Sequence, residues 1–481
     1  MLVVVVIFFA LLLYFSTLRP RRSVYGPPSY PIVGCLISFY KNQNRLLDWY
    51  TELLSRSPSQ TILIDRVGST PTIITANPAN VEHIVKTQFH NYPKGRPFTD
   101  TLGDLLGRGI FNVDGELWHQ QRKAVSHEFT TRSLRDLVLR TMETEAERRL
   151  LPLLQTACTN KRSIDLQEVL NRFAFDIVCK VSFDMDPQSL LPSMPPCHLA
   201  RAFDIATAIS ARRAAEPLQM IWKAKRALRI GSEQRLREAV DSLHKSVMEM
   251  VQTKKSLGSE DLLSRLLSIY NKDENLARDM VINFLLAGRD TISAALTWFF
   301  WLLTHHPHVQ KTITDEISRL QILSFDTLHE LKFLKASLCE SMRLYPPIVW
   351  DSKHAENDDV LPDGTFVPQG SRVTYFPYGM GRMETLWGKD CLEFRPWRWL
   401  DPCSGNEEEV PVSTYKFPIF HGGPRQCLGK DMAFMEMKYI VAVILSRFEL
   451  KPINTSKPQL IPFLTTHMAG GFHVLVKGKK V

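Results

Sequence analysis

Apolar residues recur every three or four positions through much of the chain, which is the period of an amphipathic helix. The stretches 165–183 and 233–252 show this spacing and predict helices. Short apolar runs at 61–65 and 70–76 predict instead a pair of strands around a turn at Gly68. The pattern therefore predicts a mainly helical body with small β-sheets, an α+β fold.

Two polar stretches predict loops between these elements. Four prolines fall within 184–198, and Asp, Gly and Pro residues gather at 356–370 before the strand-like sequence RVTYFPY. Neither stretch divides the chain convincingly, and internal repeats are missing from it. We therefore expect one large domain over residues 35–481.

Residues 1–18 form an apolar run without charge, and Arg19, Arg21 and Arg22 follow at once. About 20 apolar residues span a bilayer, so this run predicts a transmembrane anchor. A cleaved signal peptide is the alternative, but its basic residues normally precede the apolar run. Basic residues stay on the cytosolic side, which predicts a body that faces the cytosol. The basic, proline-rich residues 19–34 then form a stiff hinge.

The chain has 481 residues, with 59 Lys and Arg against 50 Asp and Glu, a formal net charge of +9. This excess favours an acidic protein partner or an anionic membrane surface. It is too small and too dispersed to indicate nucleic-acid binding. The eight cysteines contain no Cys-x-x-Cys pair, so they predict reduced thiols rather than a zinc site or a disulfide framework.

A strongly apolar helix predicted over 281–303 is interrupted in its middle. Ala287 and Gly288 remove bulk from one face, and Asp290 and Thr291 place a carboxyl and a hydroxyl among apolar neighbours. Glycine and a buried charge are both costly in such a helix. One interpretation is a close helix contact, with the threonine bonded to its own backbone. The other is a ligand groove in which an acid and an alcohol relay protons.

Two further pairs lie at helical spacing. Glu340 and Arg343 share one face of a helix and can form an ion pair. Their apolar neighbours indicate a buried pair, and a buried arginine needs a further acceptor from elsewhere. Trp118 and Arg122 also point the same way and could hold a carboxylate of a ligand. In isolation, an interfacial tryptophan beside a solvated arginine is the better interpretation of that second pair.

One cysteine stands apart because glycines surround it. Cys427 lies in FHGGPRQCLGK (420–430), two residues after Arg425 and just before a predicted apolar helix. A helix N-terminus stabilises a thiolate, and glycines let backbone amides approach the sulfur. A nucleophilic-cysteine hydrolase with His421 as its base is one interpretation. A thiolate that ligates a metal is the other.

Together these four motifs resemble the cytochrome P-450 superfamily, the haem-thiolate monooxygenases. Phe420 to Gly429 fits F-x-x-G-x-R-x-C-x-G, Ala287 to Thr291 fits A-G-x-[DE]-T, and the two pairs fit E-x-x-R and W-x-x-x-R. The resemblance covers essentially the whole chain. It implies haem b as cofactor, dioxygen as co-substrate, and electrons from NADPH through a separate reductase.

The resemblance also implies roles for individual residues. Cys427 would be the axial ligand of the haem iron, and Asp290 and Thr291 would deliver protons. Glu340 and Arg343 would brace the core, with Arg398 as third member. The residues expected to contact the haem are Trp118, Arg122, Ala287, Gly288, Phe420, Gly423, Arg425, Cys427 and Gly429, with Lys353 as a further propionate contact. One departure is FRPWRWL (394–400), where Trp397 stands in place of the usual Glu and puts a local polar contact in doubt.

Longer stretches, 109–129, 284–303 and 358–391, resemble the plant fatty-acid ω-hydroxylase clan, and within it the group that oxidises fatty acids and jasmonoyl-amino acid conjugates. This implies terminal hydroxylation, with the acid as a further product. An apolar channel should hold the substrate end-on, and Lys94 or Arg96 at its entrance would hold a carboxylate. Plain core packing or solvated surface explains Lys94, Arg96 and the channel residues listed next equally well. The expected channel residues are Phe284, Leu285, Ile348, Val349, Trp350, Leu464 and Thr465.

The same resemblance implies partners and a location. A basic proximal face would dock the flavoprotein reductase, and the substrate would be a lipid-like small molecule. The protein would be a single-pass protein of the endoplasmic reticulum membrane, with its catalytic domain in the cytosol. A sterol or terpenoid is the alternative substrate. A membrane-tethered helical interaction protein without haem is the non-enzymatic alternative.

Overall fold

The computed structural model describes residues 25–30, 33–65, 71–129, 132–191, 198–216, 218–257, 263–264, 267, 273–401, 403 and 408–479. The predicted transmembrane anchor and part of the hinge lie outside these residues. Among the helices of the described ranges, none is both long enough and apolar enough to cross a bilayer.

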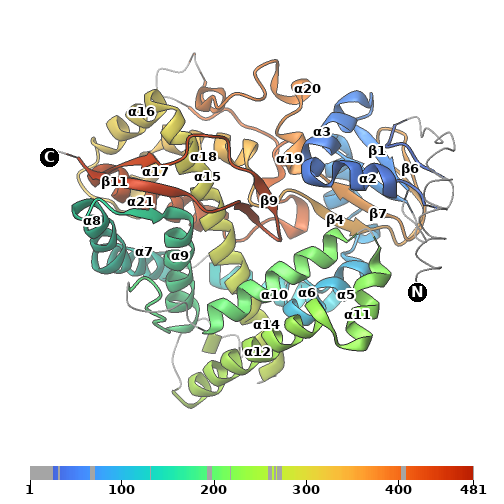
Figure 1. Cartoon of the computed structure of the whole chain (residues 1–481), viewed down its shortest axis with the longest axis horizontal. Coiled ribbons are helices and arrows are strands. Elements are labelled where there is room, and N and C mark those ends of the chain that lie inside the picture. The colour runs from blue at the N-terminus through green and yellow to red at the C-terminus, as the bar shows by residue number, and fades with distance from the viewer. Residues whose placement is uncertain are drawn as a thin grey trace, which may run out of the picture.

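Helices make up most of the described chain, as the sequence predicts (Figure 1). The two periodic stretches form α9 (Leu166–Phe183) and α12 (Gly231–Leu257). Asp165 caps the N-terminus of α9, because its carboxylate accepts hydrogen bonds from the backbone amides of Gln167 and Glu168. The other helices are α2 (Leu36–Asn42), α3 (Leu46–Arg56), α4 (Pro78–Glu82), α5 (Gly95–Leu106), α6 (Gly115–Phe129), α7 (Arg132–Glu145), α8 (Leu151–Thr159), α10 (His198–Ala215), α11 (Gln219–Leu228), α14 (Glu274–Leu285), α15 (Thr291–His305), α16 (Pro307–Ile317), α17 (Phe325–Glu330), α18 (Lys332–Leu344), α19 (Pro377–Met380), α20 (Glu384–Trp387) and α21 (Lys430–Arg447).

The described residues form four small sheets. The predicted strand pair is present as β1 (Thr61–Ile64) and β2 (Thr72–Thr75), which are antiparallel. Strand β7 (Arg372–Tyr375) joins β2 in parallel and β4 (Asp351–His354) joins β7 antiparallel, so this sheet has the order β1-β2-β7-β4. It lies at the same end of the molecule as α2 and α3 (Figure 1).

The other three sheets of the described residues have two or three strands each. Strand β11 (His473–Gly478) lies between β3 (Ser163–Asp165) and β8 (Phe448–Pro452), and β9 (Leu460–Pro462) pairs with β10 (Thr466–Met468). Two-residue strands β5 (Asp359–Val360) and β6 (Phe366–Val367) pair within the stretch predicted as a loop. Their brevity explains why no strand pattern marks them in the sequence.

The apolar helix predicted over 281–303 runs through the middle of the molecule (Figure 1), but it is not a continuous α-helix. Helix α14 passes at Leu286–Asp290 into one π-helical turn, η5, and then into α15. The π-turn therefore coincides with the Ala-Gly-Arg-Asp sequence. Such turns are rare and often mark functional sites. A methyl group on Gly288 would lie 2.8 Å from Val178 Cγ2 on α9, so a close helix contact requires this glycine.

The largest core cluster packs α15 against α18 and α21. Trp298 of α15 is fully buried and stacks on Tyr345, with ring centroids 4.2 Å apart and planes 4° apart. Glu316 holds the start of α18, because its carboxylate accepts the amides of Phe333 and Leu334 at 2.8 and 2.9 Å. These contacts fix the three helices whose side chains meet at the cavity described next.

Candidate functional site

A cavity of about 980 Å³ lies beside the π-turn and the first half of α15. Its wall brings together segments that are far apart in the sequence. The predicted site residues on this wall are Trp118, Arg122, Phe284, Ala287, Gly288, Thr291, Ile348, Trp350, Lys353, Phe420, Arg425, Cys427, Gly429, Leu464 and Thr465, together with Lys94 and Arg96. Three of the four motifs therefore meet at one cavity.

Two of the predicted channel residues, Leu285 and Val349, are not among the residues that line the cavity. Leu285 is fully buried in the cluster under α14, because it follows Phe284 by about 100° around the helix. Val349 is 3% exposed and belongs to the core cluster around the four-stranded sheet, against which Trp350 also packs. Their neighbours Phe284, Ile348 and Trp350 do line the cavity, so the predicted segments reach it while these two side chains pack in the core.

The turn that carries Cys427 is tightly folded against the rest of the molecule. The Cys427 amide donates to the Phe420 carbonyl at 2.8 Å, and the cysteine side chain is exposed on the cavity wall. Gly423 has φ +63°, and a methyl group there would overlap the carbonyl oxygen of Val85. Glycine is therefore required at position 423 by both backbone conformation and space.

Although the Cys427 side chain is open to the cavity, protein encloses it on the other sides, and this desolvation raises the pKa of its thiol above the usual value. The Gly429 amide and the charges of Arg122 and Lys430 lower it, but by less. The predicted stabilisation of a thiolate by the start of α21 is therefore outweighed. A bound metal ion is the kind of partner that keeps such a sulfur deprotonated.

His421 does not serve Cys427 as a base. Its Nδ1 shares a hydrogen bond of 2.7 Å with the Tyr375 hydroxyl, and burial lowers its pKa to about 4. Within the described residues no hydrogen bond joins His421 to Cys427. The geometry thus gives no support to a cysteine hydrolase. The partner of His421 is instead Tyr375, which no sequence motif indicated.

Arginine and tryptophan side chains surround the cysteine turn. Arg425 donates to the Val113 carbonyl at 2.9 Å and to Asp114 Oδ1 at 2.6 Å, and its guanidinium lies 4.5 Å from the Trp118 ring centroid. Arg122 donates to the carbonyl of Gln426. The Arg425 Nε is buried and has no hydrogen-bond partner. An unsatisfied buried donor costs about 1–3 kcal/mol, so an anionic acceptor in the cavity fits this position.

A buried carboxylate on β4 holds several polar groups of the cavity wall. Asp351 accepts from Lys353 at 2.6 Å, from Lys94 at 2.7 Å and from the Tyr375 hydroxyl at 2.9 Å. Although burial alone would raise the pKa of Asp351, Lys353 and Lys94 hold it well below its usual value. Lys94 is therefore already paired, whereas Arg96 is exposed. One signal for this group was present in the sequence, because Asp351 and Lys353 lie two residues apart on a strand and so share a face.

The acid and alcohol of the central helix face different surroundings. The Thr291 hydroxyl lies on the cavity wall and donates to the Ala287 carbonyl at 2.6 Å, as the first interpretation of this helix predicts. Asp290 is 5% exposed and lies behind the wall, 3.6 Å from Arg289, which pairs with Asp204 at 2.6 Å. Burial raises the pKa of Asp290.

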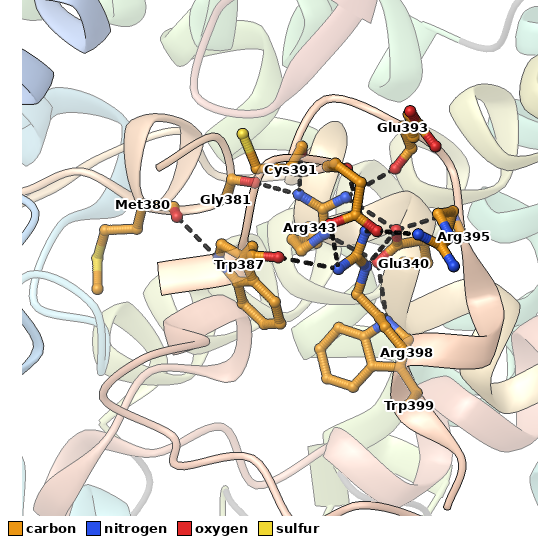
Figure 2. A network of polar contacts seen from close by, with 11 residues as sticks. Glu340, Arg343, Met380, Gly381, Trp387, Cys391, Glu393, Arg395, Arg398 and Trp399 are labelled. Carbon is orange, nitrogen blue, oxygen red and sulfur yellow. Dashed lines mark hydrogen bonds and ion pairs between the residues drawn. The ribbon is translucent and has the colours of Figure 1, made fainter. Parts of the chain in front are cut away.

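Figure 2 shows the network around Glu340, which is fully buried, as the sequence predicts. Its carboxylate pairs with Arg343 through two hydrogen bonds of 2.8 Å and accepts from Arg398 Nε at 2.8 Å. It also accepts from the Trp399 indole and the Arg395 amide, each at 2.9 Å. The further acceptors expected for Arg343 are the backbone carbonyls of Gly381, Cys391 and Glu393.

Trp397, which replaces the usual Glu, makes aromatic contacts instead of polar ones. Its ring stacks on His308 at a centroid distance of 5.7 Å with planes 6° apart, and it lies 5.1 Å from the Phe333 ring. The side chain remains 44% exposed. The loop is thus fastened to α16 and α18 without the missing carboxylate.

Comparisons with known proteins agree with this geometry. The chain matches the family model described as cytochrome P-450 over residues 24–473. It is 55% identical to cytochrome P-450 94B3 of Arabidopsis thaliana, over 95% of this chain and 92% of that protein. It is 46% identical to cytochrome P-450 94A1 of Vicia sativa (94% and 90%) and 37% identical to cytochrome P-450 86B1 of Arabidopsis thaliana (96% and 87%).

Proposed function

Because this chain belongs to the cytochrome P-450 family, whose members are haem-dependent monooxygenases, we propose that it hydroxylates the terminal carbon of a fatty acid or a jasmonoyl-isoleucine-like conjugate. The reaction is RH + O2 + 2 electrons + 2 protons giving ROH + H2O, with the acid as product of further rounds. The resemblance of 109–129, 284–303 and 358–391 to the plant ω-hydroxylase clan supports this substrate class.

The observation that carries the proposal is the apolar wall of the cavity that contains Cys427. Terminal C–H bonds are attacked only if the substrate chain is held end-on, and an apolar tube can hold it so. Arg96, exposed on α5, is the proposed contact for the substrate carboxylate, because Lys94 is neutralised by Asp351. Apolar wall residues from separate elements include Phe284, Ile292, Ala295, Ile348, Met437 and Leu464.

Haem is the cofactor of this family, and the residues present fit it. We propose that Cys427 ligates the iron and that Arg425, Arg122, Trp118 and Lys353 hold the propionates; the unpartnered Nε of Arg425 supports this. When bound, haem activates dioxygen with electrons that come from NADPH through a separate reductase. Phe420 and Gly429 also lie on the wall, whereas Gly423 lies behind it and shapes the turn.

The other predicted site residues are proposed to leave room in the cavity, to supply protons or to brace the fold. Ala287 and Gly288 leave room beside the π-turn, and Thr291 presents its hydroxyl to the cavity. Asp290 is proposed as the acid that works with Thr291, although it lies behind the wall beside Arg289. Glu340, Arg343 and Arg398 are proposed to brace the loop that precedes the cysteine turn.

Two measurements test the proposal. The reduced, carbon-monoxide-bound protein should show the thiolate-type Soret band, and Cys427→Ala should abolish it while the apoprotein stays folded. Turnover of a panel of fatty acids, jasmonoyl-isoleucine and sterols, with product identification, should give terminal alcohols of the first two classes. Ring hydroxylation of a sterol as the only activity would contradict the substrate class but not the enzyme class.

We also propose that residues 1–18 anchor the protein in the endoplasmic reticulum membrane, that 19–34 form a hinge, and that 35–481 form the catalytic domain. The uncharged run followed by three arginines supports this division. The full chain should sediment with membranes and resist extraction by high salt. A chain lacking residues 1–18 that sediments in the same way would contradict the anchor.

A further inference from the structure

A second cavity, of about 730 Å³, adjoins the main cavity that contains Cys427. Its walls come from α5 and α11, which lie beside each other (Figure 1), and from the residue after α11. Asp100, Trp222 and Lys223 line both cavities, so the two meet at these side chains. Most residues on the wall of the second cavity are exposed, and we call it the outer cavity. Neither the sequence motifs nor the proposed function gives it a role.

Charged side chains line the outer cavity, and its cations outnumber its carboxylates. The charged residues on its wall are Lys223, Arg226, Arg229, Asp100 and Asp104. Among the described residues, Lys223 has no hydrogen bond and no ion pair, and its ammonium group lies 5.8 Å from the ring centroid of Trp222. The point where the two cavities meet therefore holds a cation that is free to bind an anionic group.

The Asp104 carboxylate joins α5 to two other helices. It accepts from Arg213 of α10 at 2.8 Å and from Arg226 of α11 at 2.9 Å. Arg213 is 3% exposed, lies under the Trp222 ring and is also paired with the buried Glu233. Arg226 is instead half exposed, and Asp104 is its one ion-pair partner within the described ranges. An anion can therefore replace Asp104 at Arg226 while every buried charge keeps a partner.

The surface becomes apolar on the side of the main cavity. Helices α5 and α10 and the start of α11 present mainly apolar side chains to it, among them Phe98, Leu102, Ala211, Ala214 and Leu218. A molecule with an anionic head and a long apolar tail matches this order of polar and apolar surface. Such a molecule enters tail first, which is the orientation that attack at its terminal carbon requires.

We propose that the outer cavity binds the carboxylate of the substrate, and that Lys223 and Arg226 contact it. The inference rests on the proposed function, because it takes the substrate to be a fatty acid or another long apolar acid. The substrate carboxylate displaces Asp104 from Arg226, and Asp104 stays paired with Arg213. Arg96 lines the main cavity alone and is the inner contact, whereas Lys223 belongs to both cavities. The head group is thus held where the chain enters.

Binding of dodecanoate and of its methyl ester to the haem-loaded full chain, followed by the shift of the Soret band, tests this site. The two probes have the same chain, but only the acid carries a charge. At low salt we expect the acid to bind roughly tenfold more tightly than the ester, and the difference to shrink as salt screens the charges. Equal affinities for the acid and the ester at low salt overturn the inference.

Variants then assign the preference to these two cations. Lys223→Gln and Arg226→Gln should each raise the Kd of the acid roughly threefold, and the double variant roughly tenfold, while the Kd of the ester stays unchanged. Lys225→Gln is the matched control, because Lys225 is exposed on the same helix but lines neither cavity. A double variant that binds the acid like the wild type, or that weakens acid and ester alike, overturns the inference.

Asp104→Asn should act in the opposite direction. It frees Arg226 from its competing partner, whereas Arg213 keeps Glu233, so the Kd of the acid should fall. A higher Kd of the acid in this variant would overturn the displacement of Asp104.

Product identification separates a failure of this site from a failure of the proposed function. Terminal alcohols formed from both probes at equal affinity overturn the carboxylate site alone, whereas no binding and no turnover of either probe overturns both proposals. The carbon-monoxide Soret band reports whether each variant folds. If Arg226→Gln or Asp104→Asn does not fold, Lys223→Gln and the salt dependence of the wild type still decide.

Discussion

The buried carboxylate of Glu340 makes a sharp prediction about stability. Replacing it by glutamine keeps the shape of the side chain but turns one oxygen into an NH2 group that cannot accept hydrogen bonds. Oε1 accepts from Arg343, Arg398 and the Arg395 amide, and Oε2 accepts from Arg343 and Trp399. Whichever oxygen is replaced, at least two buried donors lose their acceptor.

The magnitude follows from those two donors. Each buried donor left unsatisfied costs about 1–3 kcal/mol, and breaking a buried ion pair by removing one charge costs about 3–5 kcal/mol. We therefore expect Glu340→Gln to lower the free energy of unfolding by about 3–5 kcal/mol. That loss is a large part of the roughly 5–15 kcal/mol that stabilises a typical protein.

Urea unfolding of the haem-loaded protein, followed by circular dichroism, measures this change. Glu409→Gln is the matched control, because Glu409 pairs with Lys335 at 2.6 Å but is 46% exposed. A surface pair of this kind contributes only about 0–1 kcal/mol. A Glu340→Gln protein within about 1 kcal/mol of the wild type, like the control, would refute the reasoning.

Three further predictions concern single positions. Gly423→Ala should sharply lower the yield of haem-loaded protein, measured by absorbance per protein, because its methyl group overlaps the Val85 carbonyl; a normal yield would contradict this. Trp397→Ala should lower the free energy of unfolding by about 0.5–1.5 kcal/mol through loss of the stack on His308, and a neutral result in urea would count against it. Thr465→Val should keep or raise stability by about 1 kcal/mol, because the buried hydroxyl has no partner; a loss would show a missed hydrogen bond.

Local spacing predicted those parts of the fold that depend on neighbouring residues. Helix α9 follows its apolar period closely, and Glu340 and Arg343 pair because they lie one helical turn apart. The π-turn in the central helix was not predicted, because one extra residue in a turn leaves almost no trace in an apolar sequence.

Long-range partners escaped prediction for a different reason. Asp351 gathers Lys94 and Tyr375 from two distant segments, and no sequence spacing reports such a meeting. The candidate site was located through motifs whose side chains converge only in the folded chain. Which of the channel side chains reach the cavity could be determined only from the structure, as Val349 shows.

The network of Glu340 also has a consequence for the order of folding. The hydrogen bonds that Glu340 and Arg343 make with other segments join residues 38 to 59 positions apart. The shortest separation is from Arg343 to the Gly381 carbonyl, and the longest is from the Trp399 indole to Glu340. Closing loops of this length is entropically unfavourable, so these contacts form after the local turns of α18. Interactions absent from the transition state slow unfolding without speeding folding. We therefore expect the network to set how long the folded loop survives rather than how quickly it forms.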